Sequence, residues 1–240
     1  MTEMLYQKYR PHEWAYLVGH DKVKRALQRM SERGSLGGRA FWISGPSGTG
    51  KTSMAYLIAG DVCDEDNFIE IDAGGITPKG INDLERDLKM RCLGTKSGRA
   101  VLVNESHGLR QDTIRELLVV LERIPGHVTW IFTTTDVGGG RLFKEDAHPL
   151  LSRCIKFELT VDDYASQMIM RAMAIAEAEG LDGASKEEFV ELAVKCKFNF
   201  RDVLTRIEAG EMIREPGVVV ASAKGTKEIP MIDWSVEAVV

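Results

Sequence analysis

A glycine-rich stretch between a short apolar run and a helix-forming segment constrains this chain most. Residues 45–52 read GPSGTGKT and fit the pattern G-x-x-x-x-G-K-[ST]. The apolar run 40–44 before it predicts a strand, and residues 51–59 after it predict a helix. In that setting the backbone N–H groups of the loop and the helix N-terminus face phosphate groups. The sequence therefore predicts a nucleoside triphosphate site with bound Mg²⁺.

The phosphate loop supplies most of the expected contacts to the nucleotide. Lys51 brings positive charge to the β and γ phosphates, and the Thr52 hydroxyl is the expected Mg²⁺ ligand. A glycine-rich turn with a chance lysine is the alternative, and the strand–loop–helix context disfavours it. The residues that we expect to bind the nucleotide here are Gly45, Pro46, Ser47, Gly48, Thr49, Gly50, Lys51, Thr52 and Ser53.

A second motif, VLVNESHG at residues 101–108, ends an apolar strand in two polar residues. We expect this strand to lie next to the phosphate loop, which would bring Asn104 and Glu105 near the metal and the γ phosphate. Glu105 could orient and deprotonate the attacking water. Asn104 could accept a hydrogen bond from metal-bound water, but it lacks the negative charge that holds Mg²⁺ well. The alternative, that both residues only end a strand, stays open.

The remaining pattern predicts an α/β fold followed by helices. Short apolar runs at 40–44, 68–71, 100–103, 129–133 and 154–159 predict a parallel five-stranded sheet, covered by helices at 21–33, 51–59, 81–92 and 111–123. Segments 162–179, 185–196 and 200–212 predict three further helices, with Ser185 and Glu188 in capping-box spacing. We expect a nucleotide-binding core over 1–159, a helical lid over 160–214, and a loosely ordered or partner-docking tail over 215–240.

Composition narrows the class of protein. The 240 residues carry a formal net charge of −5 and are 44% hydrophobic, enough for a full core. No apolar run approaches the roughly 18 residues of a membrane span, and the first residues lack a signal-peptide core, so we expect a cytoplasmic protein without a membrane partner. The four cysteines form no CxxC pair, which predicts neither a zinc site nor a disulfide framework.

Several stretches together resemble the AAA+ ATPase subunits of DNA sliding-clamp loaders, of the DnaX or replication factor C small-subunit type. They occur in that family's order over roughly residues 4–214. The stretches are LYQKYRP at 5–11, LVGH at 17–20, the phosphate loop, ESHGLRQDTIRELLVVLERIPGHVTWIFTTT at 105–135 and LSRC at 151–154. The resemblance implies an AAA+ P-loop fold, ATP and Mg²⁺ as ligands, and hydrolysis of ATP.

The resemblance also implies roles for residues outside the two motifs. Thr134 matches the first sensor of the γ phosphate, Arg153 the arginine finger that acts on a neighbouring subunit's nucleotide, and Arg201 the second sensor in the lid. Two of these have plainer alternatives, since Thr134 also favours a strand and an arginine early in a helix, such as Arg201, is usually solvated. The segment expected to line the adenine site consists of Tyr9, Arg10, Pro11 and Val18.

Four departures from the family pattern are visible. The chain lacks the zinc module of bacterial DnaX, which favours the small subunits of phage, archaeal or eukaryotic loaders. His20 replaces the usual glutamine, and the connection at 137–147 is longer and richer in glycine. The family also carries a third helical domain that forms a collar, for which we expect this chain to be too short.

The implied partners are other AAA+ subunits in a homo- or hetero-oligomer, a sliding clamp and primer–template DNA. Interleaved acids make a solvated surface at least as good an explanation of the basic residues near the expected DNA face. That basic set is Lys79, Arg86, Lys89, Arg91, Lys96, Arg99, Arg110 and Arg115. A clamp-loading ATPase is the favoured function. A nucleotide-gated adaptor with little hydrolysis and a helicase loader remain alternatives.

Overall fold

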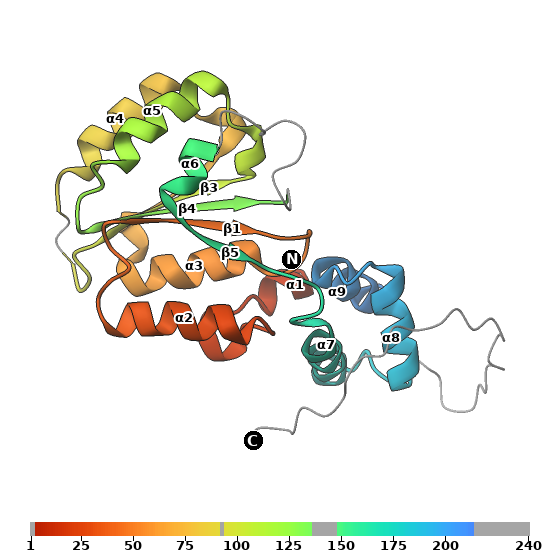
Figure 1. Ribbon diagram of the computed structural model, residues 1–240. Helices are drawn as coiled ribbons and strands as arrows, with labels where there is room; N and C mark the ends of the chain where they lie inside the picture. Colours follow the sequence, from red (N-terminus) through yellow and green to blue (C-terminus); the bar gives the residue numbers. More distant parts are fainter. Residues whose placement is uncertain (1–2, 92–93, 136–147, 214–240) are drawn as a thin grey trace. The chain divides into compact units, whose positions relative to one another are not determined.

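The computed structural model describes residues 3–91, 94–135 and 148–213, which divide into two compact units. The first unit, residues 11–160, is built on a five-stranded sheet (Figure 1). Its strands are β1 (Arg39–Ser44), β2 (Phe68–Asp72), β3 (Arg99–Asn104), β4 (Val128–Thr134) and β5 (Cys154–Glu158). Every strand pair is parallel. The predicted parallel five-stranded sheet is therefore confirmed.

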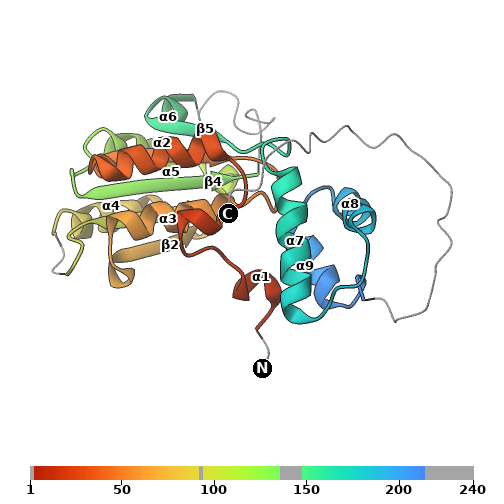
Figure 2. The ribbon, with the colours of Figure 1, turned by 90° about the horizontal axis from the view of Figure 1, so that it is seen from below.

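Helices cover both faces of this sheet. The pair α2 (Asp21–Glu32) and α3 (Lys51–Val62) lies on one face, and the pair α4 (Pro78–Leu88) and α5 (Gln111–Leu121) lies on the other (Figures 1 and 2). Successive side chains of a strand point to opposite faces. In β3, Ala100 and Leu102 accordingly join the core beneath α2 and α3, while Val101 and Val103 join the core beneath α4 and α5.

The strand order differs from one expectation. It runs β2-β3-β4-β1-β5, so β4 lies between β3 and the strand that leads into the phosphate loop. The expectation that residues 101–108 follow a strand next to the phosphate loop is therefore wrong. The reason lies in β4, which is buried over its whole length. A strand that is buried on both faces gains most at the centre of a sheet covered by helices.

Helix α4 starts earlier than its apolar spacing indicates. Thr77 precedes it, and its Oγ1 accepts a hydrogen bond from the Gly80 N–H at 3.1 Å. Pro78 takes the first helical position, where its missing N–H costs nothing. The helix ends at Leu88, so the predicted range 81–92 was displaced toward the C-terminus. The cap and the proline were signals in the sequence that the apolar spacing alone did not use.

Short elements complete the first unit. These are α6 (His148–Ser152) and four turns of 3₁₀ helix, namely η1 (Trp14–Tyr16), η2 (Glu65–Asn67), η3 (Ala73–Gly75) and η4 (Ser106–Gly108). None was predicted, because segments of three to five residues carry too little periodicity to identify them. The connection 137–147 and the tail 215–240 lie outside the described residues.

The second unit is helical and includes the start of the chain. Helices α7 (Ala165–Glu179), α8 (Lys186–Lys195) and α9 (Phe200–Glu208) confirm the three predicted helices, although α9 ends before the predicted residue 212. The predicted capping box is present, since Ser185 Oγ accepts from the Glu188 N–H at 3.3 Å and Glu188 Oε2 accepts from the Ser185 N–H at 2.8 Å.

Residues 3–10 belong to this helical unit, whereas the expected domain over 1–159 placed them with the sheet. Helix α1 (Leu5–Lys8) packs against α9, and Lys8 pairs with Glu179 at 2.7 Å. The opposite boundary, expected between 159 and 160, lies within one residue of the division after Thr160. Among the described residues, no helix combines the length and apolar character needed to cross a membrane.

Candidate functional site

The phosphate loop turns sharply after β1 and leads directly into α3. Gly45 has φ +155°, and a Cβ there would lie 2.6 Å from the Leu159 carbonyl oxygen, so only glycine fits. Gly50 has φ +92° and is the N-cap of α3. A left-handed residue at that point favours glycine. The loop therefore presents the N-terminus of a twelve-residue helix at the carboxyl edge of the sheet, where an anion is stabilised.

Polar groups inside the loop hold its shape. The Lys51 ammonium, with only 7% of the residue exposed, donates to the Pro46 carbonyl oxygen at 2.7 Å. The Thr49 hydroxyl donates to the same oxygen at 2.9 Å. Lys51 thus lies within the loop, against an acceptor that a phosphate oxygen could replace. Because a charged donor prefers an anionic acceptor, that exchange favours nucleotide binding.

His20, which lies just before α2, contacts the phosphate loop through the Thr49 carbonyl oxygen. It is 1% exposed and adopts φ 56° as the N-cap of α2. Its Nε2 lies 3.0 Å from the Thr49 carbonyl oxygen, so Nε2 carries the proton and donates it. The sequence singled out His20 only as a departure from a family pattern, and its contact with the phosphate loop was missed. The same contact holds the segment that contains Val18 against the loop.

A row of polar side chains crosses the carboxyl ends of three strands on the face covered by α3. Thr133 of β4 donates its hydroxyl to Asn104 Oδ1 at 2.8 Å, and the Asn104 amide donates to Glu70 of β2. The Tyr56 hydroxyl of α3 donates to the other oxygen of Glu70 at 2.7 Å. Both groups of the Asn104 amide are therefore engaged. The sequence predicted Asn104 but missed Glu70 and Thr133, because nothing local relates residues on three different strands.

Glu105 follows Asn104 in the left-handed region, with φ 50°. Its carboxylate is exposed and lies 3.3 Å from His107 Nδ1 and 3.5 Å from the Thr135 hydroxyl. The Thr134 hydroxyl lies 3.4 Å from the same His107 nitrogen, and the Thr134 carbonyl oxygen accepts from the Gly45 N–H at 3.3 Å. The structure therefore brings Glu105, Thr134 and the start of the phosphate loop to one edge of the sheet.

Arg153 lies at the other edge of the sheet, where β5 begins. Its guanidinium donates to the Pro149 carbonyl oxygen at 2.8 Å and pairs with Glu122 at the end of α5. The hydrogen bond from Arg153 is the main reason that the pKa of the Glu122 carboxyl lies below its usual range. Arg153 and the phosphate loop of the same chain thus lie at opposite ends of parallel strands.

Three expected site residues belong to the helical unit. The Tyr9 hydroxyl donates to Glu179, which raises the pKa of that hydroxyl, and the Arg171 guanidinium lies 5.8 Å from the centre of the Tyr9 ring. Arg201 is the second residue of α9, and its guanidinium lies 5.4 Å from the centre of the Tyr6 ring. Arg10 is half-buried at the end of this unit, whereas Pro11, also half-buried, begins the sheet unit. Each expected role of these residues in nucleotide binding stays a prediction.

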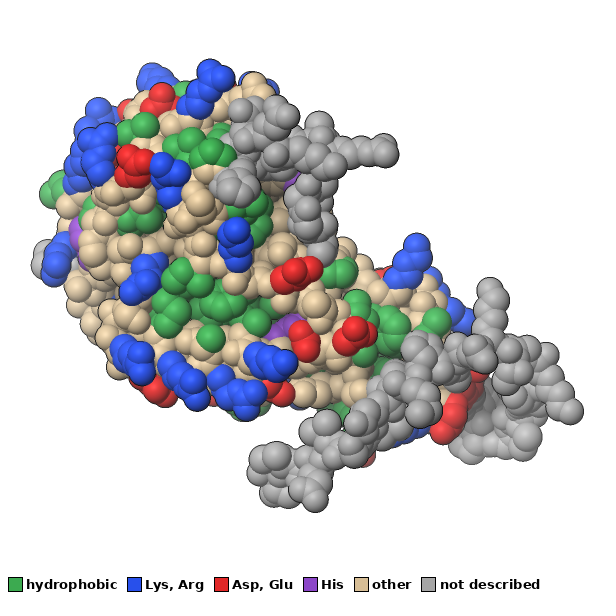
Figure 3. Space-filling model, viewed as in Figure 1, with side chains coloured by type: hydrophobic (Ala, Val, Ile, Leu, Met, Phe, Trp, Pro, Cys, Tyr) green, Lys and Arg blue, Asp and Glu red, His purple; other side chains and the backbone are tan. Residues whose placement is uncertain are grey.

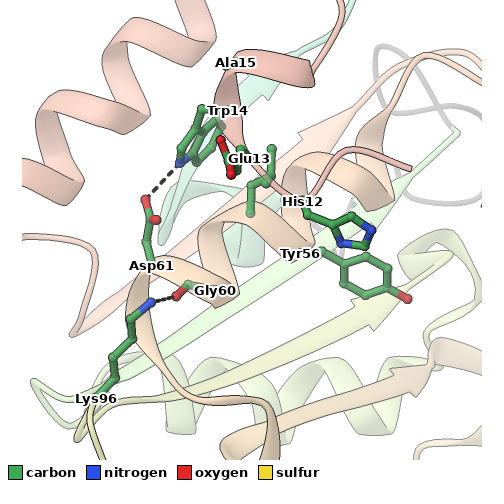
Figure 4. A pocket seen from close by; sticks show the side chains of 9 residues that line it. His12, Glu13, Trp14, Ala15, Tyr56, Gly60, Asp61 and Lys96 are labelled. Carbon is green, nitrogen blue, oxygen red and sulfur yellow. Dashed lines mark hydrogen bonds between the residues drawn. The ribbon is translucent and has the colours of Figure 1, made fainter. Parts of the chain in front are cut away.

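A pocket of about 420 Å³ lies beside the second half of α3 (Figure 4). Trp14 donates its indole N–H to Asp61 at 3.0 Å on one side, and Lys96 donates to the Gly60 carbonyl oxygen on another. The Tyr56 ring lies beside His12, with its hydroxyl directed away from the pocket. No residue of the phosphate loop lines this pocket, so it is separate from the predicted nucleotide site.

The basic residues proposed near DNA divide into two groups. Arg86 and Lys89 pair with acids on their own helix, at 2.7 and 3.5 Å, and Lys96 and Arg99 donate to backbone carbonyls. The exposed remainder is Lys79, Arg91, Arg110 and Arg115. On the face in Figure 3, Lys and Arg side chains also gather over α2, where the exposed cations are Lys22, Arg25 and Arg29. The three cations on α2 were not among the residues that the sequence indicated near DNA.

The sequence of this chain is similar to proteins of known families. Residues 41–157 match the family described as "ATPase family associated with various cellular activities (AAA)". The chain is 28% identical over 232 residues to DNA polymerase III subunit gamma/tau of Mycoplasma pneumoniae, covering 87% of this chain and 32% of that protein. It is also 28% identical over 187 residues to the replication factor C small subunit of Halobacterium salinarum, covering 75% of this chain and 54% of that protein.

The two kinds of relative match at the same identity, so the comparisons do not support the expected leaning toward small subunits. The chain spans about a third to a half of the length of these relatives. Among solved structures, the RuvB Holliday junction branch migration motor of Thermotoga maritima aligns with a TM-score of 0.64 at 20% identity, over 83% of this chain and 64% of that one, which shows the fold alone. Residues 41–157 therefore match a domain of the AAA ATPase family, and over most of its length the chain is similar to DNA polymerase III gamma/tau and replication factor C small subunits.

Proposed function

We propose that this chain binds and hydrolyses ATP as one subunit of an assembly of AAA+ subunits that loads a sliding clamp on primed DNA. The observation that carries the proposal is the position of Glu105 and Thr134 at the same edge of the sheet as the phosphate loop, with the Thr134 carbonyl bonded to Gly45. Fold alone would not decide between ATPases of different purpose. The similarity to polymerase subunits supports a role in DNA replication.

The proposed chemistry divides among four side chains. Lys51 leaves the Pro46 carbonyl and pairs with the β and γ phosphates, where a charged acceptor strengthens the bond. Glu105 is exposed and takes the proton of the attacking water. The Thr134 hydroxyl, 3.4 Å from His107 Nδ1, would orient this water by hydrogen bonding. His107, 3.3 Å from Glu105, holds that carboxylate in place and also lies near the Thr134 hydroxyl.

The residues near α3 fit Mg²⁺. The Thr52 hydroxyl lies on the first turn of α3, one turn before Tyr56, and hard oxygen donors of this kind suit Mg²⁺. Thr52 would be a direct ligand, and Asn104 would accept from a metal-bound water. When bound, the ion neutralises charge on the phosphates.

Arg153 is proposed to act on a neighbouring subunit. In the register of β1 and β5, Ala40 pairs with Cys154, so Arg153 lies about five residues before Ser44 along the strand direction. That separation is about 16 Å and exceeds the reach of an arginine side chain. The guanidinium therefore cannot serve its own phosphate loop. A phosphate of the adjacent subunit would replace Glu122 as its partner.

Contacts with DNA are proposed at the ends of α4 and α5. Lys79 lies in the first turn of α4, Arg110 is the N-cap of α5, and Arg115 lies one turn further on. All three are exposed, and backbone N–H groups at helix N-termini favour phosphate oxygens. A formal net charge of −5 means that such contacts must be local rather than spread over the surface.

ATP turnover with Mg²⁺ tests the proposal, measured with and without primed DNA and a sliding clamp. We expect slow hydrolysis by the chain alone and faster hydrolysis in the assembly. Glu105→Gln should abolish turnover while ATP binding persists, whereas Glu32→Gln, an exposed acid at the end of α2, should change neither. Absence of turnover under every condition would refute the proposed activity.

Trans-complementation tests the role of Arg153 separately. In assemblies built from copies of this chain, Glu105→Gln and Arg153→Ala proteins should each be inactive alone. When they are mixed, an intact Glu105 in one copy meets an intact Arg153 in the next, so part of the activity should return. No recovery in mixtures that still assemble would exclude an arginine acting between copies.

A second candidate function is a nucleotide-gated adaptor that binds ATP but hydrolyses little. The observation in its favour is Asn104, whose neutral amide is engaged on both sides by Thr133 and Glu70. ATP binding that drives assembly, combined with unmeasurable turnover in the presence of DNA and clamp, would support the adaptor over the loader.

A further inference from the structure

The metal site of the proposed ATPase lacks a carboxylate at position 104, but a carboxylate lies directly beside it. We propose that Glu70 supplies the negative charge for Mg²⁺ at this site, through metal-bound water, and that Asn104 and Tyr56 position Glu70 for this role. The inference rests on the proposed function, because it concerns the metal that accompanies ATP.

The register of the sheet brings Glu70 to this position from a strand that motif reasoning does not consider. Asp72 of β2 pairs with Asn104 of β3, so Glu70 starts two residues earlier and its longer side chain reaches forward to the Asn104 amide. Phe68, two residues before Glu70, packs into the core beneath α3, whereas Ile69 packs into the opposite core. The alternation of a strand therefore places Glu70 on the α3 face, as it does Asn104.

Helix α3 relates Glu70 to the phosphate loop. The Tyr56 hydroxyl donates to Glu70 at 2.7 Å, and Tyr56 follows Thr52 by one helical turn on the same side of α3. Thr52 is the hydroxyl residue of the phosphate loop. The carboxylate of Glu70 therefore faces the side of α3 that carries the expected metal ligand, and in this proposal a water molecule coordinated to Mg²⁺ bridges the two.

The hydrogen bonds that hold Glu70 leave it able to accept more. Its two oxygens accept one bond each, from Asn104 and from Tyr56, whereas a carboxylate has about four acceptor positions. The side chain is exposed, so the remaining positions can face water. Mg²⁺ retains several of its waters in protein sites, and carboxylates in the outer shell tune its affinity.

The same contacts explain the neutral residue at position 104. An asparagine can donate to Glu70 and accept from Thr133 at the same time. An aspartate could not donate, and it would place a second negative charge against Glu70. In this interpretation the charge of the site has moved from β3 to β2, and Asn104 is the amide that holds it there.

The experiment measures metal binding rather than turnover. Mn²⁺, whose paramagnetic resonance reports the free ion, is titrated into the full chain with a saturating non-hydrolysable ATP analogue. Glu70→Gln keeps an acceptor for Asn104 but removes the charge, and we expect its Mn²⁺ affinity to fall about 10-fold or more. Glu65→Gln removes an equal charge from an exposed position just before β2 and should leave the affinity unchanged.

A double substitution gives the sharper test. In Glu70→Gln with Asn104→Asp, the carboxylate and the amide exchange places, so the hydrogen bond between them persists in reverse and the charge returns to the site. We expect the double variant to recover most of the lost Mn²⁺ affinity. Analogue affinity in EDTA, measured for every variant, shows that each phosphate loop remains folded.

The outcomes separate this inference from the proposed function. If the unsubstituted chain fails to bind the ATP analogue, the proposed function fails. If the unsubstituted chain binds analogue and metal, but Glu70→Gln binds Mn²⁺ as tightly, Glu70 has no part in the metal site and only this inference is overturned. A double variant as weak as Glu70→Gln would also contradict it.

Discussion

His20 gives the most direct test of how the phosphate loop is held. In His20→Ala the Thr49 carbonyl loses the ring N–H that donates to it at 3.0 Å, in a region where the histidine is 1% exposed. An unsatisfied buried carbonyl costs about 1–3 kcal/mol. With the void left by the ring, the free energy of unfolding should fall by about 2–4 kcal/mol. Alanine and histidine both carry a Cβ, so the strain of φ 56° largely cancels between them.

His20→Gln is the matched control, because a glutamine amide can also donate to the Thr49 carbonyl. Urea unfolding followed by tryptophan fluorescence measures both variants, since Trp14, Trp42 and Trp130 lie in the sheet unit with the loop. We expect the affinity for an ATP analogue to fall in His20→Ala and to be largely retained in His20→Gln. A loss of stability below about 0.5 kcal/mol in His20→Ala would refute the argument that this hydrogen bond supports the loop.

Three further outcomes follow from contacts in the sheet unit. Arg153→Ala should raise the pKa of Glu122 toward its ordinary value, which carbon-13 NMR titration measures; because the folded-state pKa is lowered, the pair persists at neutral pH and is lost as pH falls through that lowered value. Burial raises the pKa of Cys154 to about 12, so peptide mass spectrometry at pH 8 should find slow alkylation in the folded protein and fast alkylation in urea. Asn104→Asp should lower the urea midpoint without metal, through repulsion by Glu70, and Mg²⁺ with an ATP analogue should restore it.

The elements that the sequence predicted best carry their own local signals. The strand from Arg39 to Ser44 and the helix from Lys51 enclose a motif whose spacing requires them, and the Ser185–Glu188 box marks a helix start by its own hydrogen bonds. Strand order carries no such signal. Whether β3 or β4 lies next to β1 depends on which strand gains most from two covered faces. That gain is a property of the assembled sheet.

The candidate site divides in the same way. Lys51 and Glu105 were identified because each belongs to a motif contiguous in the chain. The part played by His20 was missed because it touches the loop across 29 positions, and Glu70 was missed because it reaches Asn104 across 34. Contacts between residues so distant in sequence follow from the parallel register and from the packing of α2 and α3 against one face. Single-sequence patterns do not contain that information.

The interpretation of Asn104 changes once its neighbours in the structure are known. From the chain alone it is a missing charge, and it weakens the case for hydrolysis. In the sheet it donates to the carboxylate of Glu70, accepts from one hydroxyl and precedes the exposed Glu105, so acids on β2 and after β3 still lie beside it. If metal handling belongs to Glu70 and water activation to Glu105, the two substitutions Glu70→Gln and Glu105→Gln should separate cleanly. The first should weaken metal binding with the ATP analogue, and the second should stop turnover with metal affinity retained.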